Sequence, residues 1–267
     1  MTAAQQIIET LRGGLVVSCQ AYPGEPLRSP EIMSRMAQAA VLGGAVAIRA
    51  QGPDDIRLVH QTVSVPQIGL WKIGDRGVFI TPTLAHALAV VDAGAEVVAI
   101  DGTRRSRPDG LTLQQTIEAI HDRSSALVMA DAGDLDDALA SQDAGADLVG
   151  STLAGYTPSR PRTNGPDLEL IGQLAGRLSV PVLAEGRVHT PQQARACLDA
   201  GAHAVVVGTA ITHPTAITSW FADALTADRR LDNRRGGPPT GEQPQTGPAD
   251  EHRILAQPVP DQFEGTA

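Results

Sequence analysis

Three observations predict that this chain folds as a single (β/α)8 barrel with a short N-terminal helix and a C-terminal tail. The chain has 267 residues, close to the roughly 250 that are typical of such barrels. A glycine-centred motif recurs four times at nearly even spacing, and eight short apolar runs alternate with segments of helical periodicity. The even spacing argues against the alternative, an open doubly wound sheet.

The repeated motif joins the end of a helix to the start of a strand. It reads Gly-Gly-Ala in the first copy and Ala-Gly-Ala in the other three, and an apolar run follows each copy. Glycine just past a helix accepts the left-handed conformation that ends many helices. The central glycines are Gly44, Gly94, Gly145 and Gly201.

The remaining elements follow from the pattern of apolar residues. Continuous apolar runs are typical of parallel strands covered by helices; four lie at 14–19, 66–71, 126–130 and 180–184, and four follow the glycines. Apolar residues at helical spacing predict the helices between them. The expected helices are 30–42, 54–63, 84–92, 113–121, 135–143, 168–178, 191–199 and 215–225.

The two ends of the chain are expected to differ. Residues 5–11 predict a short helix that closes the bottom of the barrel, so the barrel domain spans residues 1–226. Residues 227–267 hold proline and glycine clusters with little periodicity. This composition predicts a largely disordered tail.

Composition excludes several classes of protein. The formal net charge is −9, and the short arginine clusters at 104–107 and 229–235 form no basic face, so we expect no nucleic-acid partner. No apolar run approaches the roughly 20 residues that span a bilayer, and the N-terminus lacks a signal-peptide pattern. We therefore expect a cytoplasmic protein with no membrane partner. Cys19 and Cys197 stand far apart, which predicts buried thiols and neither a disulfide framework nor a metal site.

Lys72 is the only lysine, since the other 20 basic residues are arginine. Arginine supplies a permanent charge, whereas lysine can give up its proton. The residue ends the apolar run of the third expected strand. Lys72 is therefore a candidate for proton-transfer chemistry, and a residue left over from coding bias is the plain alternative.

The ends of the expected strands carry a set of reactive side chains. In barrel enzymes the carboxyl ends of the strands face one mouth. The eight ends, in strand order, are Gln20, Arg49, Lys72, Asp101, Asp131, Ser151, Glu185 and Gly208-Thr209. The first seven are residues that can hydrogen-bond or ionise.

The last two strand ends predict a phosphate site. Gly186 and Gly208 would let backbone N–H groups approach a ligand, and the loops after strands 7 and 8 bind phosphate in many such barrels. A lysine and a glutamate facing a phosphorylated ligand could form a Schiff base or move a proton at carbon. The residue pattern leaves both chemistries open.

Six motifs stand in one order along the chain: VSCQA at 17–21, ITPT at 80–83, DGTRRSRP at 101–108, MAD at 129–131, GSTLAGYT at 150–157 and AEGR at 184–187. Together they resemble the bacterial N-acetylmannosamine-6-phosphate 2-epimerase family. The likeness runs from about residue 7 to about residue 225 and leaves out the tail.

This resemblance implies a cofactor-independent, metal-free barrel enzyme that interconverts N-acetylmannosamine 6-phosphate and N-acetylglucosamine 6-phosphate in amino-sugar and sialic acid catabolism. By position, Lys72 resembles the acid/base that removes and returns the proton at C2, and Glu185 resembles its partner. Gln20, Arg49 and Asp131 match substrate-binding positions. Inverting a stereocentre beside a masked carbonyl needs such proton transfer and stabilisation of enolate charge.

Two positions depart from the family pattern. His213 stands where the family usually has arginine, which predicts a weaker or more pH-dependent phosphate clamp. The stretch after Lys72 is shorter than usual and begins Ile73-Gly74-Asp75. The expected phosphate ligands are Gly186, Arg187, Gly208, Thr209 and His213.

Two other functions stay open beside the epimerase. One is a Schiff-base aldolase or lyase that uses Lys72 on a phosphosugar. The other is a phosphosugar-binding protein without turnover, which the two departures and the tail motivate. The expected binding partner is the phosphorylated amino-sugar substrate. The oligomeric state is left open, with a homodimer as the candidate.

Overall fold

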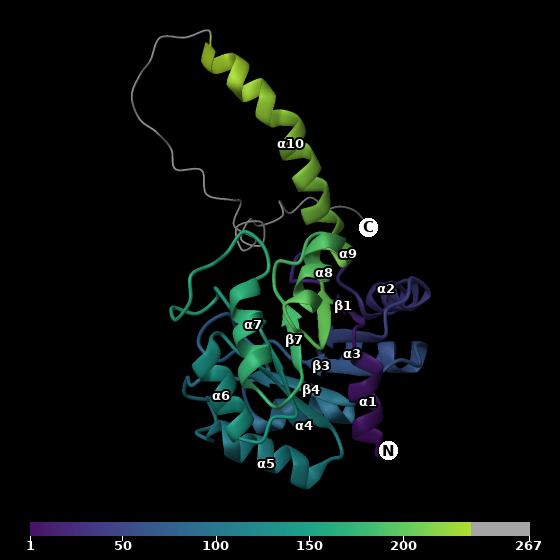
Figure 1. The fold of residues 1–267 in the computed structure, drawn as a ribbon. Helices are drawn as coiled ribbons and strands as arrows, with labels where there is room; N and C mark the ends of the chain where they lie inside the picture. The colour runs from purple at the N-terminus through teal and green to yellow at the C-terminus, as the bar shows by residue number, and fades with distance from the viewer. Residues whose placement is uncertain (236–267) are drawn as a thin grey trace, which may run out of the picture.

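In the computed structural model, eight parallel strands close into one barrel surrounded by helices (Figure 1). The structure describes residues 1–235, with side chains for residues 1–226. Each strand pairs with its neighbours in sequence, and β8 closes the barrel on β1 through the register Val16 to Val206. The predicted fold class is confirmed. The strands are β1 Leu15–Cys19, β2 Ala47–Gln51, β3 Gln67–Leu70, β4 Val97–Asp101, β5 Leu127–Asp131, β6 Leu148–Gly150, β7 Val182–Glu185 and β8 Ala204–Val207.

The helices begin at side-chain caps that the sequence supplies. A serine, threonine or aspartate precedes seven of the helices, and its side chain accepts a hydrogen bond from the backbone N–H three residues on. These caps satisfy N–H groups that have no partner within the helix. The helices through α8 are α1 Ala3–Leu11, α2 Pro30–Leu42, α3 Pro53–Thr62, α4 Leu84–Asp92, α5 Leu113–Arg123, α6 Leu135–Asp143, α7 Leu168–Arg177 and α8 Pro191–Asp199.

The repeated glycines end four helices as predicted. Gly44, Gly94, Gly145 and Gly201 have φ values of 100°, 111°, 96° and 103°. After each glycine, the next residue donates its N–H to a carbonyl five residues earlier, as Ala45 does to Ala40 at 2.9 Å. This is the hydrogen bond of a Schellman motif. The glycine then turns the chain directly into the next strand.

The N-terminal helix packs against the inside of the barrel. Leu11 is fully buried among the inward side chains of the strands, and Ile7 and Ile8 pack against the same cluster. The His203 ring lies 2.8 Å from the Ile8 carbonyl oxygen, which ties α1 to the start of β8. The helix lies where the predicted bottom plug would be.

The chain leaves the barrel through two further helices. After β8 come the short α9, Thr209–Thr212, and the long α10, Pro214–Arg235, which projects away from the barrel (Figure 1). The helix expected at 215–225 thus continues into the segment expected to be disordered. The rest of that segment, residues 236–267, lies outside the described residues.

Both cysteines are free and buried, Cys19 at the end of β1 and Cys197 on α8. Burial, with a smaller contribution from Asp55, raises the pKa of Cys19 to about 12. Burial raises the pKa of Cys197 to about 11. Neither thiol is therefore ionised near neutral pH, and neither is a candidate nucleophile.

No helix in the described part of the chain is long and apolar enough to cross a membrane.

Candidate active site

A buried arginine lies at the centre of the barrel mouth. Arg49 is 1% exposed and donates to both carboxylate oxygens of Asp131, with Nη2–Oδ2 at 2.6 Å and Nη1–Oδ1 at 3.2 Å. Its Nη1 also lies 2.7 Å from Oε2 of Glu185. A charge buried to this extent needs such compensation. Strands β2, β5 and β7 thus bring three predicted site residues into one cluster.

The position of Arg49 differs slightly from the prediction. Arg49 lies two residues before the end of β2 rather than at it. Its side chain therefore reaches the mouth from inside the barrel, where it also contacts the Met129 sulfur at 3.7 Å.

Thr152 connects the two carboxyl groups and was not singled out from the sequence. Its hydroxyl lies 2.6 Å from Oδ1 of Asp131 and 3.1 Å from Oε2 of Glu185. A hydroxyl has one proton to donate and can also accept. The Thr152 hydroxyl can therefore donate to either carboxylate, but to only one of them at a time. The sequence feature that could have identified Thr152 is its position directly after Ser151, at a predicted strand end.

The carboxyl group of Glu185 has a shifted pKa with several opposing causes. Burial raises the pKa of Glu185 above its ordinary value, the Arg49 charge opposes this, and the Asp131 charge adds to it. The Thr152 hydroxyl and the Lys72 charge lower it by smaller amounts. For Arg49, burial disfavours the charge, but Asp131 and Glu185 raise its pKa above the ordinary value. Arg49 therefore remains a fixed cation.

Lys72 lies just beyond β3, in a short hairpin. It forms an antiparallel bridge with Ile80, and the flanking hydrogen bonds run from the N–H of Ile73 to Phe79 at 3.0 Å and from the N–H of Thr81 to Trp71 at 2.8 Å. The shortened stretch after Lys72 is the exposed tip of this hairpin. The lysine backbone is therefore held from both sides.

Thr81 fixes this hairpin to the barrel. It is fully buried with φ at 45°, a conformation that is unusual for a β-branched residue. Its hydroxyl donates to the Ala99 carbonyl at 2.6 Å and accepts from the Trp71 N–H at 3.0 Å. Arg107 donates to the Thr81 carbonyl at 3.1 Å. The strained residue thus joins the Lys72 hairpin to β4.

Gln20 supplies a buried acceptor beside β1. Its Nε2 donates to the Ser18 hydroxyl at 2.7 Å. Its Oε1 is buried and accepts no hydrogen bond from any residue that the structure describes. A buried acceptor of this kind is costly unless a ligand donor satisfies it.

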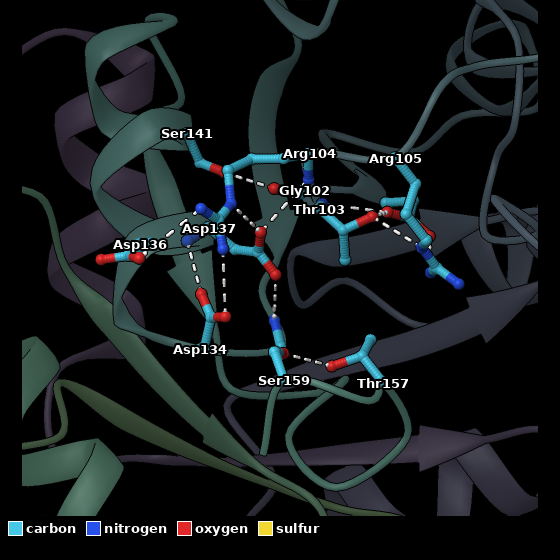
Figure 2. A network of polar contacts seen from close by, with 12 residues as sticks. Gly102, Thr103, Arg104, Arg105, Asp134, Asp136, Asp137, Ser141, Thr157 and Ser159 are labelled. Carbon is cyan, nitrogen blue, oxygen red and sulfur yellow. Dashed lines mark hydrogen bonds and ion pairs between the residues drawn. The ribbon is translucent and has the colours of Figure 1, made fainter.

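The loops after β4 and β5 are fastened to each other by ion pairs. Asp137 accepts from the backbone N–H of Arg104 at 3.2 Å and from its Nε at 2.9 Å. Figure 2 shows these contacts among the side chains around Arg104. Asp134 and Asp136 also pair with Arg104, and the Ser141 hydroxyl donates to the Gly102 carbonyl at 3.0 Å. The network fixes the loop that follows Asp101 against the loop that follows Asp131.

Asp101 and Ser151, the other two predicted strand ends, are tied into the mouth itself. Asp101 accepts from Thr103 and pairs with Arg105 at 2.7 Å, while its burial raises its pKa. The Ser151 hydroxyl donates to the Glu185 carbonyl at 2.9 Å. Both residues support the wall of the mouth.

The predicted phosphate ligands lie in two loops. Gly186 follows Glu185 with φ at 107°, and Gly208 caps α9, which Thr209 begins. The Arg187 side chain, in contrast, is used to hold the β6–α7 loop. It donates to the Ala154 carbonyl at 2.9 Å and to the Thr163 hydroxyl at 3.1 Å.

His213 joins the loop after β8 to the loop after β1. Its Nδ1 lies 3.4 Å from Oε1 of Glu25, and its ring meets the edge of Tyr22 with centroids 5.3 Å apart. Thr212 donates to the Ser18 carbonyl at 2.8 Å, which fixes α9 over β1. Neither Tyr22 nor Glu25 was singled out from the sequence. The available signal for Tyr22 was the scarcity of tyrosine, of which the chain has two.

Within the described residues, no group of three or more histidine, cysteine or acidic side chains is arranged to hold a metal ion.

Replacing Arg49 with methionine should destabilise the protein by about 3–5 kcal/mol at pH 8, because two buried carboxylates lose their counter-charge. The loss should shrink as the pH falls. Burial already raises the pKa of Glu185 above its value in the unfolded chain. As the pH falls, this carboxyl therefore takes up a proton in the folded variant before it does so in the unfolded chain. The state that binds more protons is stabilised by acidification, so the variant regains part of its stability. Urea unfolding at pH 5.5 and pH 8 measures the difference.

The control for this variant is Arg12→Met, which breaks an exposed pair with Glu9. That change should cost under about 1 kcal/mol at either pH. An equal loss for Arg49→Met at both pH values would contradict the proposed role of the buried carboxylates.

Comparison with known proteins gives a consistent family. The family described as "Putative N-acetylmannosamine-6-phosphate epimerase" matches residues 33–227. A protein from Cutibacterium acnes, described as "Putative N-acetylmannosamine-6-phosphate 2-epimerase", is 61% identical over 222 residues, covering 82% of this chain and 97% of that protein. One from Caldanaerobacter subterraneus is 47% identical over 232 residues, covering 86% and 98%.

Solved structures agree with the sequence relatives. The N-acetylmannosamine-6-phosphate 2-epimerase from Clostridium perfringens superposes with a TM-score of 0.79 at 40% identity, covering 82% of this chain and 96% of that one. A thiamine phosphate pyrophosphorylase from Pyrococcus furiosus, with a TM-score of 0.55 at 19% identity, shares the fold alone. The chain therefore belongs to the N-acetylmannosamine-6-phosphate 2-epimerase family.

Proposed function

We infer that the chain interconverts N-acetylmannosamine 6-phosphate and N-acetylglucosamine 6-phosphate by inverting C2. Family membership supports the substrate and the reaction. The observation that carries the mechanism is the presence of the only lysine beside a buried Arg49–Asp131–Glu185 cluster, near enough for its charge to influence the pKa of Glu185. A base next to a charge-compensated mouth suits proton transfer at carbon.

Lys72 is assigned as the acid/base. In the open-chain sugar, a neutral amine takes the C2 proton and becomes an ammonium group. The electron pair of the C–H bond moves toward the C1 carbonyl, which becomes an enolate. Return of the proton to the opposite face restores the carbonyl and the neutral amine, so no other reactant is consumed. Arginine at this position could not serve, because it keeps its proton.

Glu185 and Arg49 are assigned to orient the sugar and to balance the developing charge. Glu185 is 15% exposed at the mouth, and the contacts of its carboxylate with Arg49 and Thr152 both involve Oε2. Within the described residues no donor reaches Oε1, which suits a sugar hydroxyl. Arg49 stays charged and supplies a fixed positive field for an enolate. Asp131 holds Arg49 in place.

Gln20 is assigned to the acetamido or hydroxyl side of the substrate. Its buried Oε1 needs a donor, and both an amide N–H and a sugar hydroxyl can provide one. The backbone around Gly186, Gly208 and Thr209 is assigned to the phosphate, with the Arg187 backbone and the His213 ring beside it. Glycine allows the close approach that backbone N–H groups need.

The reaction belongs to amino-sugar and sialic acid catabolism, in the cytoplasm. A phosphorylated sugar carries charge that prevents unaided passage through a bilayer, so an enzyme acting on it works where the phosphate was added. Schiff-base aldolase or lyase chemistry and binding without turnover are not favoured, because the relatives are described as epimerases.

Lys72→Arg should abolish epimerisation while substrate binding persists, since the positive charge remains but arginine keeps its proton and cannot act as the base. The assay is conversion of N-acetylmannosamine 6-phosphate in deuterated water, with deuterium at C2 of the product as the readout. Wild-type turnover without deuterium uptake would argue against a freely exchanging lysine proton. A fully active Lys72→Arg enzyme would overturn the assignment, and borohydride trapping of an adduct would favour the Schiff-base alternative.

His213→Arg should lower KM by about three- to tenfold at pH 8, because a guanidinium carries a permanent charge and two N–H groups that can pair with a phosphate. The measurement is KM at pH 8. His121→Arg is the charge-matched control, since His121 pairs with Asp147 at the exposed end of α5. An unchanged KM at pH 8 would remove His213 from the phosphate site.

A homodimer is proposed on the basis of α10. Phe221 and Leu225, one helical turn apart, are 68% and 78% exposed on this projecting helix. Apolar side chains exposed in this way mark interfaces when they cluster. Sedimentation of the wild type should give a mass of about twice the 27.8 kDa of one chain. The double variant Phe221→Glu, Leu225→Glu should sediment with the mass of a single chain. Asp223→Asn should leave the mass unchanged, and a monomeric wild type would reject the dimer.

A further inference from the structure

The lysine ammonium lies against an aromatic ring rather than a carboxylate. The Nζ atom of Lys72 is 4.8 Å from the centroid of the Tyr22 ring, within the range of a cation–π contact. In the part of the chain with described side chains, Lys72 forms no ion pair and no side-chain hydrogen bond. The ring is therefore its main fixed contact.

Tyr22 is itself held in place on two sides. Its backbone N–H donates to Oε2 of Glu25 at 2.7 Å, and the Glu25 N–H donates back to the Tyr22 carbonyl at 3.1 Å. The other carboxylate oxygen of Glu25 faces Nδ1 of His213 at 3.4 Å. His213 then meets the Tyr22 ring at an angle of 63°. The tyrosine thus lies between the lysine and the loop after β8.

We propose that Tyr22 is a positioning residue for Lys72, and that its ring stabilises the ammonium that exists between proton removal and proton return. This rests on the proposed function of Lys72. The Tyr22 hydroxyl makes no hydrogen bond to a described residue, so the ring is the part that acts. The loop after β1, which carries Tyr22, thus holds the side chain of Lys72, whose own hairpin is short.

A ring suits this task better than a carboxylate would. A carboxylate would accept hydrogen bonds from the ammonium and draw its protons away from the substrate. A ring face attracts the charge through its quadrupole and leaves N–H groups free to point elsewhere. The lysine can then be stabilised in its charged form and still return the proton to C2.

The contact can be tested without any assay of catalysis, because Lys72 is the only ε-amine in the chain. The probe is acetylation by a limiting amount of an acetyl ester at pH 8, followed at Lys72 by peptide mass spectrometry. Loss of the ring removes the contact that covers the amine, so Tyr22→Leu should react about three- to tenfold faster than wild type. Tyr22→Phe keeps the ring and should react at the wild-type rate. The exposed α-amine of Met1 is the internal control in every sample.

The kinetic test uses the same variants in the full-length enzyme. Tyr22→Leu should lower kcat by about tenfold with a smaller change in KM, and Tyr22→Phe should restore most of the lost kcat. Equal acetylation rates in wild type and Tyr22→Leu would overturn the contact. Faster acetylation with an unchanged kcat would overturn the positioning role. A third outcome is that the wild type is inactive while Tyr22→Leu is still acetylated faster than wild type. That result would count against the proposed function and leave the Tyr22–Lys72 contact intact.

Discussion

The mouth of this barrel depends on the buried charge of Arg49. A guanidinium that is 1% exposed is tolerable because Asp131 and Glu185 both reach it, and Thr152 in turn bonds to both acids. Removing any one partner would leave a charge in a place where water cannot compensate for it. This constraint fixes the relative positions of β2, β5 and β7 at the point where a substrate would enter. Burial raises the pKa of Glu185 above that of a surface carboxyl, and the Arg49 charge opposes this rise.

The loops around this centre are built to limit movement. Arg104 with Asp137 fastens the loops after β4 and β5, Thr81 fastens the Lys72 hairpin, and Arg187 fastens the β6–α7 loop. Each of these contacts joins a loop side chain to a backbone carbonyl or a carboxylate of another segment: Ala99 on β4, Asp137 on α6 and Ala154 in the β6–α7 loop. An acid/base lysine must hold its position to within a fraction of an ångström for efficient proton transfer. The rigid surroundings therefore match the proposed chemistry.

The repeated glycine motif shows why the fold could be predicted so closely. A helix that ends in a Schellman motif and runs into an apolar strand is a local pattern, and each copy needs only its own residues to form. Four expected helices, at 30–42, 84–92, 135–143 and 191–199, have the same bounds in the structure. The largest difference is α10, which continues to Arg235 because helical backbone can persist where apolar periodicity has stopped. Capping residues and glycines mark boundaries well, and their influence ends within a turn or two.

The sequence by itself determined the barrel, the order of its strands and the candidate residues at their ends, because these depend on local periodicity and on the common direction of parallel strands. Only the tertiary structure decided how those residues pair. Arg49 meets Asp131 across 82 positions of sequence, and Tyr22 meets Lys72 from a loop on another strand. The Arg187 side chain lies among loop carbonyls, and its expected assignment to phosphate rested on its place after Gly186 alone. Closure of the barrel brings such groups together, and burial then selects the pairings that compensate charge.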